Sequence, residues 1–273
     1  MSGDEQKSIF ITGGAGGMGM ATGRLFAQHG WFVGLFDLDE SALELARAAF
    51  DDSQSLVRRL DVTSETDFAD AMAAFSERTG GRMDVMFNNA GIAPGAWFDE
   101  MPLDTIRQVI DINVMGVIIG IRAALPLLRA TPGSLCMSTS SSVATYGHAM
   151  RAAYTASKFA VKGLTEALSL EFERFGIRTA DVLPGCIDTP MLRNALSART
   201  GEPFDESLFE TLPKEGAYRL VPVSAIADAV WNAYHSDVIH WYVPEEVGEI
   251  DRLKGADFDA ARAETRAFLF GEG

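Results

Sequence analysis

Short apolar runs alternate with longer amphipathic stretches along most of this 273-residue chain. The short runs are rich in β-branched and aromatic residues, which is typical of buried strands. In the longer stretches apolar residues recur every three or four positions, which is typical of helices. The pattern predicts strands over residues 8–11, 32–36, 55–59, 83–88, 134–138, 178–183 and 239–243. It predicts helices over residues 18–29, 39–50, 64–79, 104–129, 154–175 and 223–235.

The alternation of these elements determines the expected fold class. Strands that are separated by long helices are joined by right-handed crossovers, so they build a parallel sheet with helices on both faces. With 47% hydrophobic residues, the chain can bury one large core. We therefore predict a single-domain α/β protein with a Rossmann-type, doubly wound parallel sheet of about seven strands.

Two parts of the chain lack a clear pattern. Residues 7–190 carry most of the predicted strands and helices and should form the core of the domain. Residues 191–222 are a long irregular segment, and residues 255–273 are a C-terminal tail in which an amphipathic helix can form.

Composition and charge exclude several classes of partner. The net charge is −15 and the chain has no basic stripe, so we expect no binding to nucleic acid or to an acidic membrane surface. Cys136 and Cys186 are too few for a disulfide framework or a zinc ribbon, and no cluster of residues has metal-ligand spacing. The N-terminus does not have the pattern of a signal peptide, and no apolar run is long enough to span a bilayer. We expect a cytoplasmic protein without a metal.

The first predicted strand leads directly into a glycine-rich turn at residues 12–19. Glycines permit a tight turn and let the backbone approach a pyrophosphate closely. The helix that follows offers free N–H groups and the positive end of its dipole to phosphates. This strand–turn–helix context favours a dinucleotide site over a plain turn.

Asp37 indicates which dinucleotide this site prefers. It follows the second predicted strand, 24 residues after Gly13, where an acidic side chain accepts hydrogen bonds from the adenosine ribose. A carboxylate there repels a 2′-phosphate, and neither Gly14 nor Leu38 supplies a compensating cation. Asp37 could instead cap the next helix, but Asp39 is better placed for that. The sequence therefore favours NAD over NADP.

Tyr154 and Lys158 are four residues apart in a predicted helix and so lie on one helical face. An ammonium group close to a phenol lowers the phenol's pKa from about 10, which makes Tyr154 a candidate general base or general acid. Ser141, 13 residues before Tyr154, belongs to a serine cluster that follows a predicted strand end. Ser142 has the same chemistry, so only the spacing favours Ser141.

Six motifs resemble those of the short-chain dehydrogenase/reductase family in its compact, NAD-dependent form. Each motif is common by itself, but their shared order and spacing make the resemblance specific. It covers residues 8–191, with a looser similarity up to residue 243. The motifs are the glycine turn at 12–19, Asn-Asn-Ala-Gly at 88–91, Asn113, the serines at 138–142, Tyr-x-x-x-Lys at 154–158 and Pro-Gly at 184–185.

The resemblance implies a catalytic tetrad of Asn113, Ser141, Tyr154 and Lys158. Tyr154 would exchange the proton, and Ser141 would polarise and orient the carbonyl oxygen. Lys158 would hold the nicotinamide ribose and lower the pKa of the tyrosine. Asn113 would distort its helix locally and connect Lys158 to solvent through its backbone carbonyl and a water.

The resemblance also implies a set of cofactor contacts. Asp61 and Val62 would contact the adenine. Ile187 and Thr189 would bind the nicotinamide carboxamide and so fix which face of the ring meets the substrate. The implied cofactor-binding residues are Gly13, Gly17, Met18, Gly19, Asp37, Leu38, Asp61, Val62, Asn89, Ala90, Gly91, Tyr154, Lys158, Pro184, Gly185, Ile187 and Thr189.

Three segments should border the substrate: residues 93–98, 144–150 and 191–221. The third is rich in apolar side chains, which indicates either a lid over a hydrophobic substrate or packing against the protein itself or a second copy. Its apolar members are Leu192, Phe204, Leu208, Phe209, Leu212 and Tyr218. His148, in the second segment, is either a substrate contact or a polar turn residue.

The sequence thus predicts an NAD-dependent oxidoreductase that interconverts a secondary alcohol and a ketone, with a hydrophobic small molecule as substrate. Wide apolar faces on helices 104–129 and 154–175 resemble the family's paired helices and predict a homotetramer or homodimer. Two alternatives remain: a catalytically silent NAD(H)-binding regulator of the same fold, and an NADPH-dependent ketoacyl-type reductase. The substrate, its stereochemistry and the direction of the reaction are not determined by the sequence.

Overall fold

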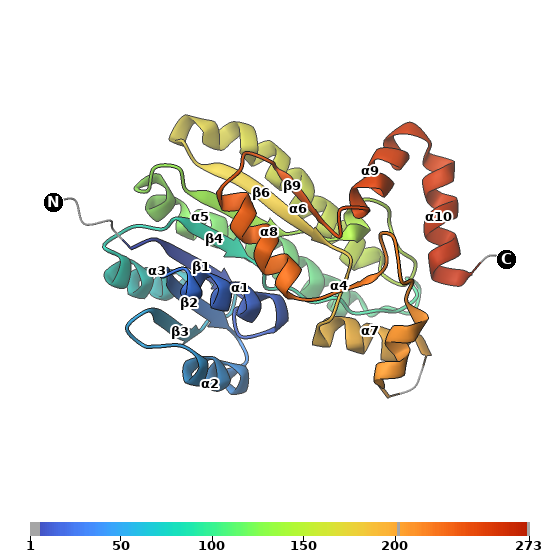
Figure 1. Cartoon of the computed structure of the whole chain (residues 1–273), viewed down its shortest axis with the longest axis horizontal. Helices are drawn as coiled ribbons and strands as arrows, with labels where there is room; N and C mark the ends of the chain where they lie inside the picture. The colour runs from blue at the N-terminus through green and yellow to red at the C-terminus, as the bar shows by residue number, and fades with distance from the viewer. Residues whose placement is uncertain (1–5, 201–202, 272–273) are drawn as a thin grey trace.

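A computed structural model describes residues 6–200 and 203–271, and it has the predicted α/β architecture (Figure 1). The strands of the central sheet are β1 (Ser8–Thr12), β2 (Phe32–Asp37), β3 (Ser55–Arg59), β4 (Val85–Asn88), β5 (Leu135–Thr139), β6 (Arg178–Pro184) and β9 (His240–Val243). The α-helices are α1 (Gly17–Gln28), α2 (Glu40–Ala49), α3 (Glu65–Thr79), α4 (Leu103–Ile110), α5 (Gly116–Arg129), α6 (Ala152–Glu171), α7 (Pro190–Thr200), α8 (Ser224–Tyr234), α9 (Val247–Ala256) and α10 (Phe258–Phe270).

The seven strands are all parallel, in the order β3-β2-β1-β4-β5-β6-β9. The chain therefore builds the sheet outward in one direction from β1 and then returns to build it in the other direction from β4. The carboxyl ends of β1 and β4 flank the point where the order reverses, which is where open α/β sheets bind ligands. The topology thus predicts the place of the site.

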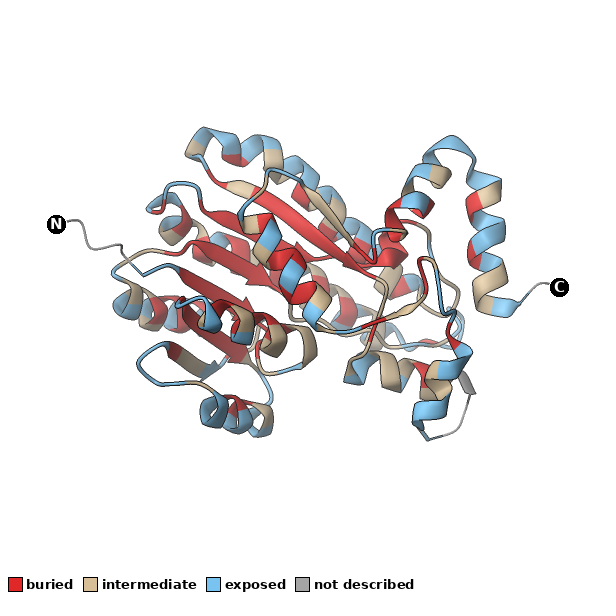
Figure 2. Cartoon of the chain, viewed as in Figure 1, coloured by how far each residue is buried: buried red, intermediate tan, exposed pale blue. Residues whose placement is uncertain are grey.

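Alternating side chains of the strands fill two separate cores. In β1, Ile9 and Ile11 join a core with residues of α1 and α8, whereas Phe10 joins a core with residues of α3, α5 and α6. This period of two follows from the pleat of a strand. Figure 2 shows the sheet as a buried layer between helices whose outer sides are exposed. Burial on both faces explains why the strands are continuous apolar runs.

The predicted helix 104–129 has an irregular centre. A π-helical segment, Asp111–Met115, lies between α4 and α5. Within the described part of the chain, Leu103–Arg129 is the one helical stretch long and apolar enough to cross a membrane, judged by length and composition alone. Its apolar side packs in the core of the domain, where Val117, Ile121 and Leu128 are buried.

The prediction that residues 191–222 are irregular is wrong. The segment contains α7, a 3₁₀ helix at Glu206–Thr211 and the strand β8 (Leu220–Val221), which pairs with β7 (Cys186–Ile187). Helix α7 begins where the sequence supplies two start signals. The Thr189 hydroxyl accepts a hydrogen bond from the Leu192 amide at 3.3 Å, and Pro190 occupies the first helical position, where its missing N–H costs nothing.

The C-terminal tail forms the predicted helix. Asp257 caps α10 by accepting a hydrogen bond from the Ala260 amide at 3.0 Å. Helix α9, which precedes it, was not predicted. Both helices lie beyond the carboxyl ends of the strands, at the right in Figure 1. They are therefore on the side of the sheet where a ligand is expected.

Candidate active site

The glycine turn between β1 and α1 has the shape that a pyrophosphate requires. Gly13 has a φ of +61°, and a Cβ on Gly19 would lie 2.2 Å from the Gly13 carbonyl oxygen, so both positions require glycine. Helix α1 begins at Gly17 without a side-chain cap and without an acidic residue in its first turn. Its first N–H groups therefore keep their hydrogen-bonding capacity for an anion, and the residues present fit a dinucleotide.

Asp37 lies at the edge of this turn. Its carboxylate accepts hydrogen bonds from the amides of Ala15 and Asp39, each at 3.2 Å. Asp39, as predicted, caps α2 by accepting from the Ser41 amide at 2.9 Å. Asp37 is therefore not needed as a cap, and it is held beside the phosphate turn, where a ribose would bind. Leu38 follows it and is exposed.

The residues predicted to meet the adenine lie at the end of the neighbouring strand, β3. Asp61 accepts a hydrogen bond from the Thr63 hydroxyl at 2.7 Å. Val62 packs closely on α5, because a Cβ on Gly116 would lie 2.9 Å from its side chain. Both are at the same carboxyl edge of the sheet as Asp37.

Asn89 follows β4 and hydrogen-bonds the ends of the two neighbouring strands, β1 and β5. Its amide nitrogen donates to the carbonyls of Thr12 and Gly13, at 3.2 and 3.1 Å. Its amide oxygen accepts from the Thr139 hydroxyl at 3.2 Å. The next residue, Ala90, donates its N–H to the Thr12 hydroxyl, and Gly91 leaves room for Asn113. The Asn-Asn-Ala-Gly motif therefore holds the carboxyl ends of β1, β4 and β5 in place at the site.

Asn113 lies in the π-helical segment, so the predicted helix distortion is present at the predicted residue. Its side chain is completely buried, accepts from the Ile92 amide and donates to the Ile92 carbonyl, both at 2.9 Å. It also donates to the Ser157 hydroxyl at 3.1 Å. A π-bulge is frequent at functional sites, and here it lets one side chain join the β4 loop to α6.

Lys158 points from α6 toward the end of β5. Its ammonium group donates to the Thr139 carbonyl at 2.7 Å and lies 5.6 Å from the centre of the Tyr154 ring. The side chain is buried, and burial lowers the pKa of Lys158 to about 8. The two residues thus share one face of α6, as their spacing predicts.

Tyr154 is influenced by different neighbours from those expected. Burial raises its pKa above the usual value, whereas a hydrogen bond with Ser141 and the positive charge of Arg151 lower it. The expectation that Lys158 lowers the pKa of Tyr154 is therefore wrong: burial raises that pKa, and the groups that oppose the rise are Ser141 and Arg151. Of the two serines, Ser141 is the one that lowers the pKa of Tyr154, which agrees with the 13-residue spacing.

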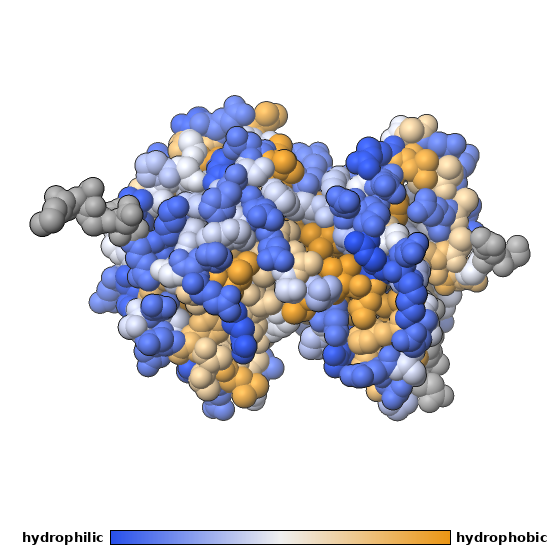
Figure 3. Space-filling view, viewed as in Figure 1, coloured by the Kyte–Doolittle hydropathy of each residue, from blue (hydrophilic) through white to orange (hydrophobic). Residues whose placement is uncertain are grey.

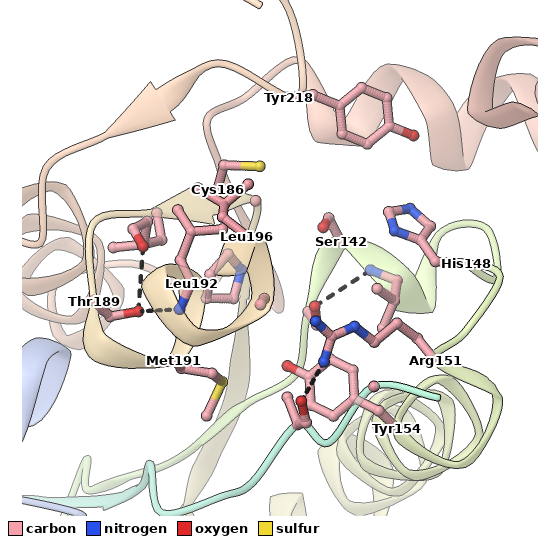
Figure 4. Close-up of a pocket in the computed structure, with 18 of the residues that line it drawn as sticks. Ser142, His148, Arg151, Tyr154, Cys186, Thr189, Met191, Leu192, Leu196 and Tyr218 are labelled. Carbon is pink, nitrogen blue, oxygen red and sulfur yellow. Dashed lines mark hydrogen bonds between the residues drawn. The ribbon is translucent and has the colours of Figure 1, made fainter. Parts of the chain in front are cut away.

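Tyr154, Arg151 and the serines Ser141 and Ser142 border a cavity of about 370 Å³ (Figure 4). Met18, from the start of α1, lines it beside the 184–189 segment, and a Cβ on Gly17 would lie 3.0 Å from the Thr189 side chain. The glycine turn therefore adjoins the cavity. Figure 3 shows apolar surface gathered in the hollow between the body of the domain and its C-terminal part. The predicted cofactor residues that line the cavity are Met18, Tyr154, Pro184, Gly185, Ile187 and Thr189.

Each of the three predicted substrate segments supplies residues that line the cavity, but some residues of these segments lie elsewhere. Ala93 and Gly95 line the cavity, as do His148 and its neighbours and Leu192, Leu212 and Tyr218. Phe204, Leu208 and Phe209 do not, which corrects the prediction for this part of the segment. Phe204 and Phe209 pack on each other, with ring centres 5.2 Å apart, and both stack on Arg193.

Two parts of the cavity wall were not predicted from the sequence. The end of α10 lines the cavity through residues 268–270, and Phe268 stacks on Tyr218 with ring centres 3.7 Å apart. Arg151, three residues before Tyr154, also lines it. The amphipathic tail was the only signal for the first, and no local sequence signal marked Arg151 as part of the cavity wall.

Comparisons with known proteins show which family this chain resembles. The sequence model of the family described as short chain dehydrogenase matches residues 7–200. Levodione reductase from Leifsonia aquatica is 34% identical, over 69% of this chain and 72% of that protein. Trans-4-hydroxycyclohexanecarboxylate dehydrogenase from Sinomonas cyclohexanicum is also 34% identical, over 68% of this chain and 74% of that protein.

A solved structure extends the similarity to the whole fold. The crystal structure of levodione reductase superposes with a TM-score of 0.79 and 29% sequence identity, covering 87% of this chain and 95% of that one. The match therefore covers most of the chain.

Proposed function

The chain belongs to the short-chain dehydrogenase family, and from that premise we propose that it interconverts a secondary alcohol and a ketone with NAD as cofactor. The observation that carries this proposal is the position of Tyr154. Its side chain and that of Ser141 border one cavity, which Met18 at the start of α1 also lines, next to the glycine turn. A proton donor and a dinucleotide turn thus meet at one cavity.

The residues of the chain would divide the chemistry among them. When bound, the nicotinamide accepts a hydride from the carbinol carbon or returns it to the carbonyl carbon. In oxidation, Tyr154 takes the hydroxyl proton as the C=O bond forms; in reduction it gives that proton to the carbonyl oxygen. Ser141 donates a hydrogen bond to the same oxygen and orients it. Lys158, whose ammonium group also bonds Thr139, would hold the ribose hydroxyls.

Asp37 supports NAD rather than NADP. Its carboxylate is fixed beside the phosphate turn by the amides of Ala15 and Asp39, where it would accept from a ribose and repel a 2′-phosphate. We predict that Asp37→Ala narrows the ratio of kcat/KM for NAD over NADP by about tenfold or more. Steady-state kinetics with both cofactors measure this ratio; an unchanged ratio would assign the preference to another group.

The form of the cavity supports a small, largely apolar substrate. Its volume of about 370 Å³ suits a single ring, and its walls are mainly apolar side chains from α7, α10 and the 144–150 loop. One relative is named for a hydroxylated cyclohexane ring. We therefore extend the proposal to ring-bearing secondary alcohols.

The two alternatives lack support in the site. A catalytically silent NAD(H)-binding regulator would not need a tyrosine and a serine together at the cavity wall, where Tyr154 and Ser141 both lie. An NADPH-dependent ketoacyl-type reductase would need a cation beside the adenosine ribose, where this chain has Asp37 and Leu38.

We also propose that the protein is a homo-oligomer in the cytoplasm, a homotetramer or a homodimer. Large apolar side chains are exposed on the helices that the family pairs between subunits: Leu103, Met115, Phe159 and Leu170. A helix face of this kind is stabilised by a partner surface. Light scattering on the purified protein measures the mass of the assembly.

A screen of substrates tests the proposed activity. The protein is incubated with NAD or NADP and a panel of secondary alcohols that includes cyclohexanols, and the absorbance of the reduced nicotinamide is followed. We expect turnover with NAD on cyclic alcohols. Tight NAD binding without turnover on any alcohol would favour the regulator, and a preference for NADPH with ketoacyl thioesters would favour the reductase.

A further inference from the structure

Arg151 is a charged side chain at the wall of an otherwise apolar cavity. It is the residue immediately before α6, so it shares the first turn of that helix with Tyr154. Figure 4 shows its guanidinium beside the Tyr154 ring, across the cavity from Thr189. Because Thr189 adjoins the glycine turn, Arg151 lies on the substrate side of the site, away from the place of the cofactor phosphates.

The protein satisfies only part of the guanidinium. Arg151 donates a hydrogen bond to the Ala93 carbonyl, and a guanidinium carries five N–H donors. Among the residues that the structure describes, no carboxylate forms an ion pair with it. Gly95 makes room for the group, because a Cβ there would lie 3.3 Å from the guanidinium carbon.

The rest of the cavity offers this cation no counter-charge. Arg151 is the one arginine, lysine, aspartate or glutamate among the described residues that line it. His148 lies nearby, but burial and the charge of Arg151 lower its pKa to about 4, so it is neutral at physiological pH. Arg151 is half-buried, and a ligand in the cavity would remove it further from water. A cation removed from water is costly unless an anion pairs with it. With a neutral ligand in the cavity, the charge of Arg151 would stay uncompensated.

We propose that Arg151 pairs with a carboxylate of the substrate, so that the substrate class is hydroxy acids and the corresponding oxo acids with an apolar frame. This inference rests on the proposed function of the same site. The planar guanidinium fork matches a carboxylate through two parallel hydrogen bonds. It also overcomes the repulsion that a protein of net charge −15 exerts on an anionic substrate. The apolar walls would hold the frame between the carboxylate and the carbinol carbon.

Arg151 also lowers the pKa of Tyr154, and the test must separate this effect from recognition of an acid. An effect on the tyrosine changes the rate with every substrate, whereas recognition of a carboxylate changes only the rate with acids. The informative quantity is therefore the ratio of kcat/KM for an acid to kcat/KM for its neutral carboxamide.

The experiment compares Arg151→Met with the wild type on matched pairs. The probes are 3- and 4-hydroxycyclohexanecarboxylate and 3-hydroxybutanoate, each against its carboxamide. We expect the wild type to prefer at least one acid, and Arg151→Met to reduce that acid-to-amide ratio by about 100-fold. Arg151→Lys should lie between them, because it keeps the charge and loses the fork. Arg266→Met, which removes an exposed charge from α10 outside the cavity wall, should keep the wild-type ratio.

A binding measurement distinguishes failure of this inference from failure of the proposed function. Cyclohexanecarboxylate is titrated calorimetrically into each protein, with and without NADH. We expect binding to the wild type at least tenfold tighter than to Arg151→Met. Equal affinities, or an acid-to-amide ratio that Arg151→Met leaves unchanged, would overturn the role of Arg151. Arginine-dependent binding without turnover of any alcohol would keep that role and reject the dehydrogenase.

Discussion

Ser141 and Ser142 present the same hydroxyl group to the same cavity, and their contacts distinguish them. The Ser141 hydroxyl accepts from the Val143 amide at 3.3 Å, and it is the serine that lowers the pKa of Tyr154. We predict that Ser141→Ala reduces kcat by about 100-fold or more, because the substrate oxygen loses a fixed donor. Ser142→Ala, the matched control, should reduce kcat by less than about tenfold. Steady-state kinetics on one alcohol compare the two, and a larger loss in Ser142→Ala would reverse the assignment.

The residues that could be predicted from the sequence are those whose role depends on near neighbours. Gly13 and Gly19 are required by the turn itself, and Tyr154 and Lys158 share a face because of helix geometry. Arg151 could not be predicted, because its place depends on Ala93 and Gly95, which are far away in sequence.

The electrostatics of the site were the harder part to predict. A spacing of four residues places an ammonium and a phenol on one face, but it does not say how deeply each is buried. Burial raises the pKa of Tyr154 and lowers that of Lys158, and only the fold determines burial. The pKa of Tyr154 is therefore raised rather than lowered, and the cation that opposes the rise is Arg151 rather than Lys158.

At the scale of elements, α10 forms one wall of the cavity. Phe268 stacks on Tyr218 and contacts the His148 ring, with ring centres 6.1 Å apart in the second pair. We predict that Phe268→Ala raises KM by about tenfold and changes kcat less, because the wall contributes to binding rather than to proton transfer. The measurement is a substrate titration at saturating cofactor.

Phe258→Ala provides the control for this variant. Phe258 lies at the start of the same helix, is exposed, and does not line the cavity. We expect Phe258→Ala to have a KM near that of the wild type. Equal KM values for both variants would mean that α10 has no part in binding the substrate.

The elements with local start and stop signals were predicted well. Helix α3 begins after Ser64, which caps it, and ends at Gly80, which has a φ of +64°. Helix α7 was missed although Thr189 and Pro190 are such signals, because its hydrophobic period is weak. The short strand β8 depends on pairing with β7 and has little signal of its own.

At the scale of the whole molecule, the strand order brings the site together. Residues from the ends of β1, β4 and β5 meet because these strands are adjacent in the sheet, although they are far apart in the chain. The alternation of strands and helices predicts this sheet and its ligand-binding edge. The contribution of α9 and α10 to that edge depends on tertiary packing and was not visible in the pattern.

The pH dependence of the free energy of unfolding should reveal that His148 is buried in the folded protein. Its pKa is about 4 in the folded protein, below the ordinary value of 6.5, because burial and Arg151 disfavour the charged form. Between these two pKa values the unfolded chain binds more protons than the folded protein. The stability that the neutral His148 contributes is therefore complete above pH 6.5 and is lost as the pH falls toward 4. We predict that the free energy of unfolding of the wild type falls about 2 kcal/mol more over this window than that of His148→Gln.

Urea unfolding at pH 7.5 and at pH 4.5 measures this difference. Other acidic groups titrate in both proteins, so the comparison of the two losses isolates the histidine. Equal losses would show that the His148 ring is as accessible to protons in the folded protein as in the unfolded chain.

The most direct test of the account is the effect of Tyr154→Phe on turnover and on cofactor binding. The variant removes the phenol hydroxyl from the cavity wall and keeps the ring. With Tyr154 as the group that exchanges the proton, kcat falls by about 1,000-fold or more while the dissociation constant for NAD stays within a few-fold of the wild type. A variant that keeps more than about a tenth of the wild-type rate would contradict the assignment of Tyr154 as the acid and base of the reaction.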